Sequence, residues 1–308
     1  MAIHSAISCA KCLLEWIVRG YLWTLGICLV IFIILAIAAN LGNRRSKYRF
    51  LAKFIMIYFA TIMGTTLLIP VFLFRPRNVI NCKIVGWFIR KCSFLLEITW
   101  EVRGARLLQD NVGGLICANH QSSIDILAMF NLWELMDRVT GIAKKEMFYV
   151  FPFGPAAWLA GLPYIDRQSP KSGYQTLGRC AKLMKEEDIK MFIYPEGTRN
   201  SKRGLLPFKR GAFKTAITAK VPITPLVVSP YYFIDAKKYI FDKGHVIISV
   251  LDPIDTADLK DTDTDTLMTN CRNLMLEEYE KLAREVDSKS TDAAWRDRNR
   301  PRIVFKDE

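Results

Sequence analysis

Two long runs without charged residues open the chain. Residues 20–41 and 54–74 contain no Asp, Glu, Lys or Arg. At ~1.5 Å per residue, each run is long enough to cross a hydrocarbon layer ~30 Å thick. Tyr21 and Trp23, at the start of the first run, are residue types that favour the lipid–water boundary. Soluble cores rarely contain two such runs, so the pattern favours a membrane-embedded helical hairpin within residues 1–80.

The basic residues around these runs leave the topology open. Five basic residues follow the first run and five follow the second, so the positive-inside rule gives no orientation. The hairpin could span the bilayer or lie in one leaflet. The ten residues are Arg44, Arg45, Lys47, Arg49 and Lys53, then Arg75, Arg77, Lys83, Arg90 and Lys91.

Beyond residue 80, helical patterns alternate with short apolar runs of strand length. This alternation predicts an α/β domain over residues 81–287, with a mixed, largely parallel sheet and flanking helices. The expected strands cover 112–118, 189–194 and 221–228, and the expected helices cover 83–101, 126–133, 172–187, 213–219 and 267–282. Residues 288–308 form a charged tail that we expect to be loosely ordered.

One further uncharged stretch, residues 147–165, is interrupted by Pro152, Pro155 and Pro163. Proline inside a helix removes a hydrogen bond and clashes with the preceding turn, so a straight transmembrane helix is not expected. The stretch fits an apolar loop and helix against the bilayer, or the wall of a groove for an acyl chain. A buried loop and helix of the soluble core is the alternative.

A histidine and an aspartate flank the predicted strand-to-helix turn after residue 118. His120 is one of three histidines in the chain, and Asp125 follows five residues later. Residues five apart on one helix point in different directions, so the two side chains meet only if the helix starts between them. Ser122 or Ser123 could be its N-cap. The carboxylate could then orient the imidazole. Alternatively, Ser122 and Asp125 form only a capping box.

Other polar residues also follow predicted strands. Arg167 comes after the short apolar run that ends at Ile165, and residues 196–199 come directly after the strand over 189–194. In open α/β sheets, sites gather at the carboxyl ends of the strands. We therefore expect His120, Arg167 and residues 196–199 to face one cleft.

Charge and cysteine content narrow the partners. The formal net charge of +13 suits phosphate groups, an anionic membrane or nucleic acid. Cys9 and Cys12 have no second pair to complete a zinc site. Residues 261–265 lack the glycine and glutamate of a calcium loop, with Thr266 and Arg272 in their places. No metal site is predicted.

Four short blocks follow one another along the α/β region: Asn119-His120-Gln121-Ser122-Ser123-Ile124-Asp125, Gly161-Leu162-Pro163-Tyr164-Ile165-Asp166-Arg167, Tyr194-Pro195-Glu196-Gly197-Thr198-Arg199 and Val221-Pro222-Ile223-Thr224-Pro225-Leu226. Together they resemble the glycerolipid acyltransferase family that includes the 1-acylglycerol-3-phosphate acyltransferases. The resemblance covers roughly residues 80–250. Tyr164 and Tyr194 stand where the family usually has phenylalanine, and Thr224 where it usually has an aliphatic residue.

The resemblance implies a reaction and a set of roles. His120 would be the general base for the sn-2 hydroxyl of lysophosphatidic acid, which attacks the thioester of acyl-CoA, and Asp125 would orient His120. Acyl-CoA is a co-substrate, and no cofactor, metal or covalent intermediate is implied. Backbone N–H groups near His120 or Gly197 could stabilise the oxyanion. The expected substrate-binding residues are Arg199 as phosphate clamp, Arg167 and Lys145 as further cations, Glu196 holding Arg199 or a glycerol hydroxyl, and Gly197 and Thr198 lining the site.

Three other readings stay open. The acceptor could be glycerol 3-phosphate or another lysophospholipid. The protein could bind or shape membranes without catalysis, although the histidine–aspartate pair argues against this. A nucleic-acid binder is suggested by charge alone, since the sequence shows no stacking motif. The family implies the endoplasmic reticulum, whereas the residues themselves indicate only a membrane.

Overall fold

The computed structural model describes residues 2–41, 46–166, 168–290 and 303–306. Its centre is a seven-stranded sheet in the order β11-β1-β10-β7-β2-β6-β3. Only the pairing of β10 with β7 is antiparallel. The mixed, largely parallel sheet predicted from the sequence is thus confirmed. The strands are β1 (Ile98–Arg103), β2 (Gly114–Ala118), β3 (Val139–Gly141), β6 (Lys190–Ile193), β7 (Ile223–Val228), β10 (Gly244–Val250) and β11 (Ile303–Lys306).

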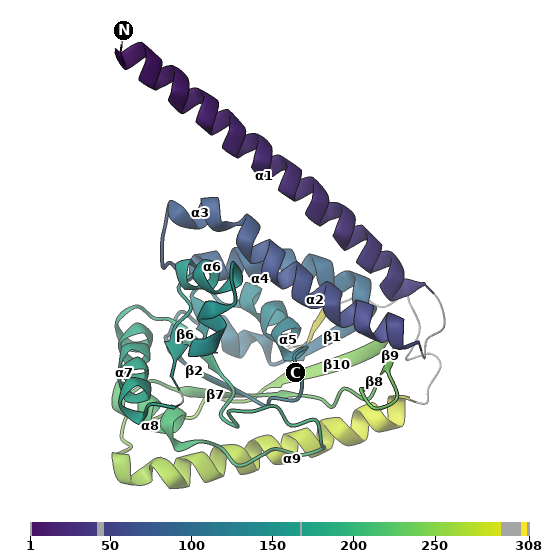
Figure 1. Ribbon diagram of the computed structural model, residues 1–308. Helices are drawn as coiled ribbons and strands as arrows, with labels where there is room; N and C mark the ends of the chain where they lie inside the picture. The colour runs from purple at the N-terminus through teal and green to yellow at the C-terminus, as the bar shows by residue number, and fades with distance from the viewer. Residues whose placement is uncertain (1, 42–45, 167, 291–302, 307–308) are drawn as a thin grey trace.

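Helices cover both faces of the sheet (Figure 1). Strand β2 is buried on both sides, with Leu115 and Cys117 in one core cluster and Ile116 and Ala118 in the other. Apolar side chains on both faces of a strand require a helical layer on each. One layer holds α2 (Lys47–Leu67), α4 (Ile80–Ser93) and α5 (Asp125–Leu132), and the other holds α7 (Pro170–Glu186), α8 (Arg210–Ala219) and α9 (Thr264–Ser290).

The first helix, α1 (Ala2–Asn40), extends away from the sheet and touches the domain mainly through α2 (Figure 1). The Tyr21 hydroxyl donates to the carbonyl of Leu67, and Cys28 Sγ lies 3.3 Å from Met63 Sδ. By length and composition, α1 and α2 could each cross a membrane. The apolar window of α1 is almost entirely exposed, whereas half of that in α2 is buried inside the protein.

Helix α2 begins earlier than its uncharged run and uses its basic residues to dock on the domain. The guanidinium of Arg49 lies 3.4 Å from the Glu97 carboxylate, and Lys53 Nζ donates to the carbonyl of Leu96. Lys53 also lies over the ring of Phe241, 4.8 Å from its centroid. Both basic side chains are buried. These two residues of the basic segment therefore stabilise the attachment of α2 and do not face lipid headgroups.

Residues 147–165 form no continuous helix, as the prolines predict. A 3-10 turn over Lys145–Tyr149 leads into the short α6 (Phe153–Leu159) and then to β5 (Tyr164–Ile165), which pairs with β4 (Ala143–Lys144). Phe151 and Tyr149 are largely exposed, while Ala156 and Ala157 are buried. The stretch therefore has an exposed aromatic tip and a buried base.

The remaining short helices and the carboxyl-terminal end complete the fold. Helix α3 (Ile69–Leu73) continues from α2, and the strands β8 (Ile234–Asp235) and β9 (Ile240–Phe241) form a hairpin. Strand β11 pairs in parallel with β1 at the sheet edge, from Trp100 opposite Ile303 to Arg103 opposite Lys306. The expectation of a loosely ordered tail is therefore wrong for this segment, because Ile303, Val304 and Phe305 have strong β propensity.

Candidate active site

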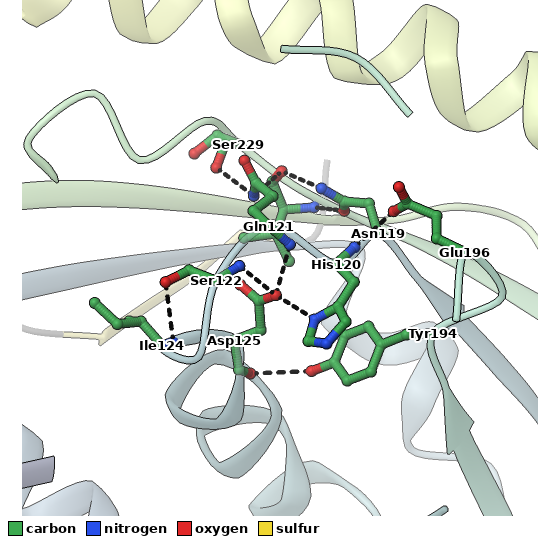
Figure 2. A network of polar contacts seen from close by, with 10 residues as sticks. Asn119, His120, Gln121, Ser122, Ile124, Asp125, Tyr194, Glu196 and Ser229 are labelled. Carbon is green, nitrogen blue, oxygen red and sulfur yellow. Dashed lines mark hydrogen bonds and ion pairs between the residues drawn. The ribbon is translucent and has the colours of Figure 1, made fainter. Parts of the chain in front are cut away.

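The side chain of Asn119, the first residue after β2, fixes the direction in which the chain leaves the sheet. The Asn119 side chain donates to the carbonyl of Val228 (3.0 Å) and accepts from the Val228 N–H (2.7 Å). It therefore replaces the backbone as the next pair of the β2–β7 ladder. This pairing lets the chain turn away from the sheet, so His120 emerges beyond the end of β2 (Figure 2).

His120 and Asp125 meet directly. His120 Nδ1 lies 2.6 Å from Asp125 Oδ2, which also accepts the N–H groups of Gln121 (2.7 Å) and Ser122 (3.0 Å). Because the carboxylate accepts, Nδ1 carries the proton and the neutral ring keeps a lone pair on Nε2. No described residue hydrogen-bonds to Nε2. The Asp125 side chain is 2% exposed and His120 is 22% exposed, so an outside group can reach the ring.

The start of α5 explains how residues five apart can touch. The helix begins at Asp125, which leaves His120 in the preceding turn. The prediction that Ser122 or Ser123 is the N-cap is wrong, because Ile124 holds that position and supplies no side-chain cap. Asp125 instead folds back to bond the N–H groups of the preceding turn. The alternative of a capping box alone is wrong as well: the Asp125 carboxylate does accept the Ser122 N–H, but it also holds the imidazole of His120.

The ring of Tyr194 lies flat against the imidazole. The two centroids are 4.1 Å apart, with 17° between the planes. The Tyr194 hydroxyl donates to the backbone carbonyl of Asp125 (3.2 Å), so the ring is itself fixed (Figure 2). Burial, with the nearby charge of Asp125, raises the pKa of Tyr194 well above its ordinary value. The phenol therefore stays protonated and supports the orientation of His120.

The Glu196 carboxylate binds backbone N–H groups of two separate segments. One carboxylate oxygen accepts the N–H of His120 (2.7 Å), and the other accepts the N–H of Leu206 (2.8 Å). The turn after β6 also supplies the N–H of Asn200 to the carbonyl of His120 (2.7 Å). Both peptide groups of His120 are thus held by one turn. Among the described residues Glu196 forms no ion pair with Arg199, which differs from the expectation that it would hold that side chain.

Burial is the main cause that raises the pKa of Glu196, and its two backbone donors oppose that effect. The hydrogen bonds of this turn also show which backbone N–H groups are available to stabilise an oxyanion. The N–H of His120 is taken by Glu196, and that of Gly197 donates to the carbonyl of Tyr194 (3.0 Å). The N–H groups of His120 and Gly197 themselves are therefore already bonded, and a role for other backbone N–H groups near them stays a prediction.

Gly197 is the residue that makes this turn possible. Its φ is +68°, in the left-handed region, and a Cβ there would lie 2.6 Å from Lys209 Cε. Thr198 and Arg199 follow it and are exposed. The Arg199 guanidinium makes no ion pair with any residue that the structure describes. It is therefore a cation available to an anionic ligand, beside the turn that holds His120.

Replacing Gly197 by alanine should destabilise the protein by about 1–2 kcal/mol, since a left-handed conformation is costly for a residue with a Cβ. Lys209 must also move. Thermal unfolding of the purified protein measures the effect. Gly178→Ala is the matched control: Gly178 is exposed within α7 and has nothing within 4 Å of its added Cβ, so this change should stabilise slightly. Equal unfolding temperatures for both variants would contradict the role given to Gly197.

Lys145 and Arg167 are the two other cations predicted to bind substrate. Lys145 Nζ lies 3.1 Å from the Asp166 carboxylate, and hydrogen bonding to Asp166 raises the pKa of Lys145. It would have to leave Asp166 to bind a phosphate. Arg167 lies outside the described residues, so its expected place in the cleft is untested. No cluster of three or more His, Cys, Asp or Glu suited to a metal occurs in the described parts of the chain.

Sequence reasoning missed the residues that support the pair. Nothing in the spacing indicates that Asn119 extends a sheet ladder or that Asn200 bonds the carbonyl of His120. The departure at Tyr194 was a usable signal, because a buried hydroxyl needs a partner. It finds the carbonyl of Asp125, and the hydroxyl of Tyr164 likewise donates to the carbonyl of Gly154 (2.9 Å).

Comparison with known proteins gives the class first. Residues 99–229, which contain β2, the His120–Asp125 turn and the Glu196 turn, match a family model described as Acyltransferase. A crystal structure of the 1-acyl-sn-glycerophosphate acyltransferase PlsC from Thermotoga maritima has a similar fold. Its TM-score is 0.59 at 20% identity, and the match covers 83% of this chain and 97% of that one.

Proteins similar in sequence identify the family more narrowly. Human 1-acyl-sn-glycerol-3-phosphate acyltransferase beta is 34% identical over 244 residues, which cover 79% of this chain and 87% of the human protein. The alpha enzyme of Bos taurus is 37% identical over 218 residues, which cover 70% and 75% of the two chains. This chain therefore belongs to the 1-acyl-sn-glycerol-3-phosphate acyltransferase family.

Proposed function

We propose that this protein moves a fatty acyl group from acyl-CoA to the sn-2 hydroxyl of 1-acyl-sn-glycerol 3-phosphate, giving phosphatidic acid and free CoA. The names of its relatives support the acceptor and the product. The observation that carries the chemistry is the His120 ring, whose Nδ1 is held by Asp125 while Nε2 stays open. Such a ring can take a proton from an alcohol near neutral pH.

The reaction follows from this geometry. Nε2 of His120 removes the hydroxyl proton as the oxygen attacks the thioester carbonyl. Asp125 stabilises the imidazolium that forms, as the acid does in a Ser-His-Asp triad. The tetrahedral intermediate then expels the CoA thiolate, which takes up the proton from the imidazolium. The acyl group passes straight from sulfur to oxygen, so no acyl-enzyme is required.

Among the described residues, the thiol of Cys117, three positions before His120, is not suited to compete as a nucleophile. Cys117, in β2, is fully buried on the face of the sheet opposite α5, the helix that begins at Asp125. Desolvation raises its pKa well above the ordinary value of a thiol. Only thiolates are good nucleophiles, so a thiol with this pKa is inert. This supports direct transfer.

Arg199 is the proposed clamp for the acceptor's phosphate, because a guanidinium can bind phosphate bidentately. We expect Arg199→Ala to raise the KM for lysophosphatidic acid about 10- to 100-fold, the range for losing a hydrogen bond to a charged group. The KM for acyl-CoA should change little. Steady-state kinetics with each substrate varied separately make the measurement. Arg179→Ala, on the exposed face of α7, is the control, and equal changes in both KM values would count against a phosphate role.

The reaction itself is tested by an acceptor panel. Purified protein receives one acyl-CoA and, in separate assays, lysophosphatidic acid, glycerol 3-phosphate and uncharged lysophospholipids, and the products are identified by mass spectrometry. Phosphatidic acid from the first acceptor alone is the expected result. A preference for another acceptor would assign a different acyltransferase, and no product with any of them would favour a lipid-binding protein without catalysis.

The proposed location is a membrane, with α1 as the main anchor and the endoplasmic reticulum as the compartment. Supporting features are the exposed apolar surface of α1 and the lipid acceptor named for the relatives. Acyl-CoA and the bilayer are the further proposed partners. Separating membrane and soluble fractions from cells that make the full chain or one lacking residues 2–40 measures how much the anchor contributes.

A further inference from the structure

The two oxygens of the Asp125 carboxylate have different surroundings. Oδ2 accepts three hydrogen bonds, from His120, Gln121 and Ser122. Oδ1 is buried, yet it makes no hydrogen bond with any described residue. A buried carboxylate oxygen without a donor is costly, because its lost hydration is not replaced by a hydrogen bond. We therefore looked for a hydrogen-bond donor close to Asp125 Oδ1.

The hydroxyl of Tyr231 is a candidate donor that also lacks a hydrogen-bond partner. Tyr231 Oη is buried and likewise has no hydrogen-bond partner in the described part of the chain. Burial first, and then the charge of the nearby Asp125 carboxylate, raise the pKa of Tyr231 well above its ordinary value. The hydroxyl therefore keeps its proton and remains able to donate. Two unpaired buried groups, one a donor and one an acceptor, thus neighbour each other.

The loop that carries Tyr231 is already tied to the active-site turn. It follows β7, and the Gln121 side chain donates to the carbonyls of Val228 and Ser229, both at 3.1 Å. The ring of Tyr231 packs near Phe233, with 5.9 Å between the centroids. The loop is thus tied to the turn that carries Asp125, and packing against Phe233 fixes the ring of Tyr231 within it.

We propose that Tyr231 is a positioning residue for the acyl transfer, and that its hydroxyl donates to Asp125 Oδ1 in the working enzyme. This inference rests on the proposed function for its meaning in catalysis. With this bond, both oxygens of the carboxylate are held from opposite sides. The carboxylate can then neither rotate away from His120 nor take a second conformation, and Nδ1 of the ring keeps its orientation.

The bond also sets how strongly Asp125 holds a positive imidazolium. A donor to the carboxylate shares its charge, so the attraction between Asp125 and the protonated ring decreases. Removing the donor should strengthen that attraction, and His120 should then gain its proton at a higher pH. The other titratable groups facing this cluster are Glu196, on the backbone of His120, and Tyr194, stacked on its ring. Neither is altered by a change at position 231.

The test compares Tyr231→Phe with Tyr232→Phe. Each change removes one hydroxyl and keeps the ring, but the Tyr232 hydroxyl accepts the backbone N–H of His245. For Tyr231→Phe we expect kcat to fall about 3- to 10-fold with both KM values within about twofold, the scale of one hydrogen bond. The acidic limb of the kcat/KM profile should move to higher pH. Tyr232→Phe should leave both measurements as in the wild type.

A second readout does not depend on activity. The chain has three histidines, so ¹⁵N spectra of the labelled protein, assigned with His120→Ala, follow the protonation of the His120 ring directly. The midpoint should rise in Tyr231→Phe. Incorporating 3-fluorotyrosine at position 231, a stronger donor, should lower it, and this variant keeps the hydroxyl if the phenylalanine variant folds poorly.

The outcomes separate the two claims. A midpoint that stays unchanged in both position-231 variants would overturn the positioning role, even if Tyr231→Phe lowers the unfolding temperature. If the midpoint moves as expected but the wild type acylates no lysophosphatidic acid, the contact with Asp125 stands and the proposed function fails. If kcat and the midpoint change equally in Tyr231→Phe and Tyr232→Phe, the effect is a general loss of packing and the inference is wrong.

Discussion

Replacing His120 by alanine is expected to lower kcat by about 10³- to 10⁴-fold while leaving the KM values close to those of the wild type. General acid–base catalysis contributes on the order of 10²- to 10⁴-fold, and we place His120 at the upper end because no base among the described residues hydrogen-bonds to Nε2. The imidazole is only 22% exposed and stacks on the ring of Tyr194, so its removal also leaves some buried space. The main effect should be on the chemical step, with a smaller loss of stability that the unfolding temperature measures separately.

Initial rates of phosphatidic acid formation from labelled acyl-CoA measure this effect. The unfolding temperature of the variant in detergent should stay within a few degrees of the wild type, which separates catalysis from stability. A variant that retains even a tenth of the wild-type kcat would remove His120 from the proposed chemistry.

Replacing Asp125 by asparagine should cost about 10³- to 10⁴-fold in kcat through the wrong tautomer of the imidazole, as in a Ser-His-Asp triad. The asparagine amide would donate to Nδ1 if its NH₂ faces the ring, which moves the ring proton to Nε2. If its oxygen faces the ring, the charge that stabilises the imidazolium is still lost. Either arrangement also weakens the bonds to the N–H groups of Gln121 and Ser122.

The same kinetic assay distinguishes this from a simple loss of stability. Asp258→Asn, on an exposed loop, removes one carboxylate far from the site and should leave kcat unchanged. An Asp125→Asn enzyme with wild-type kcat and a lowered unfolding temperature would give Asp125 a purely structural role.

The sequence anticipated the parts of this site that are local in the chain. His120 and Asp125 can meet only if a helix starts between them, and the spacing alone stated that condition. The placement of His120 and the Glu196 turn at the ends of parallel strands followed from the alternation of apolar runs. What local reasoning could not supply is that Glu196 bonds the backbone of His120, because that contact joins segments 76 residues apart.

The sequence also could not distinguish the environments of α1 and α2. A run that is uncharged on every side carries no periodicity to say which face is buried. The half-buried α2 and the exposed α1 therefore look alike in sequence, although Arg49 and Lys53 attach α2 to the domain. Strand β11 was missed for the opposite reason, since its few β-forming residues lie within a charged tail.

The central claim is that the acyl group passes directly from the thioester to the lipid alcohol, with His120 as the base. Mixing stoichiometric purified enzyme with labelled acyl-CoA, first alone and then with lysophosphatidic acid, tests it most directly. We predict no thiol release and no labelled protein without the acceptor, and one CoA released per phosphatidic acid formed once it is added. A burst of CoA matched by label on the protein, or CoA release that yields no phosphatidic acid, would contradict the claim.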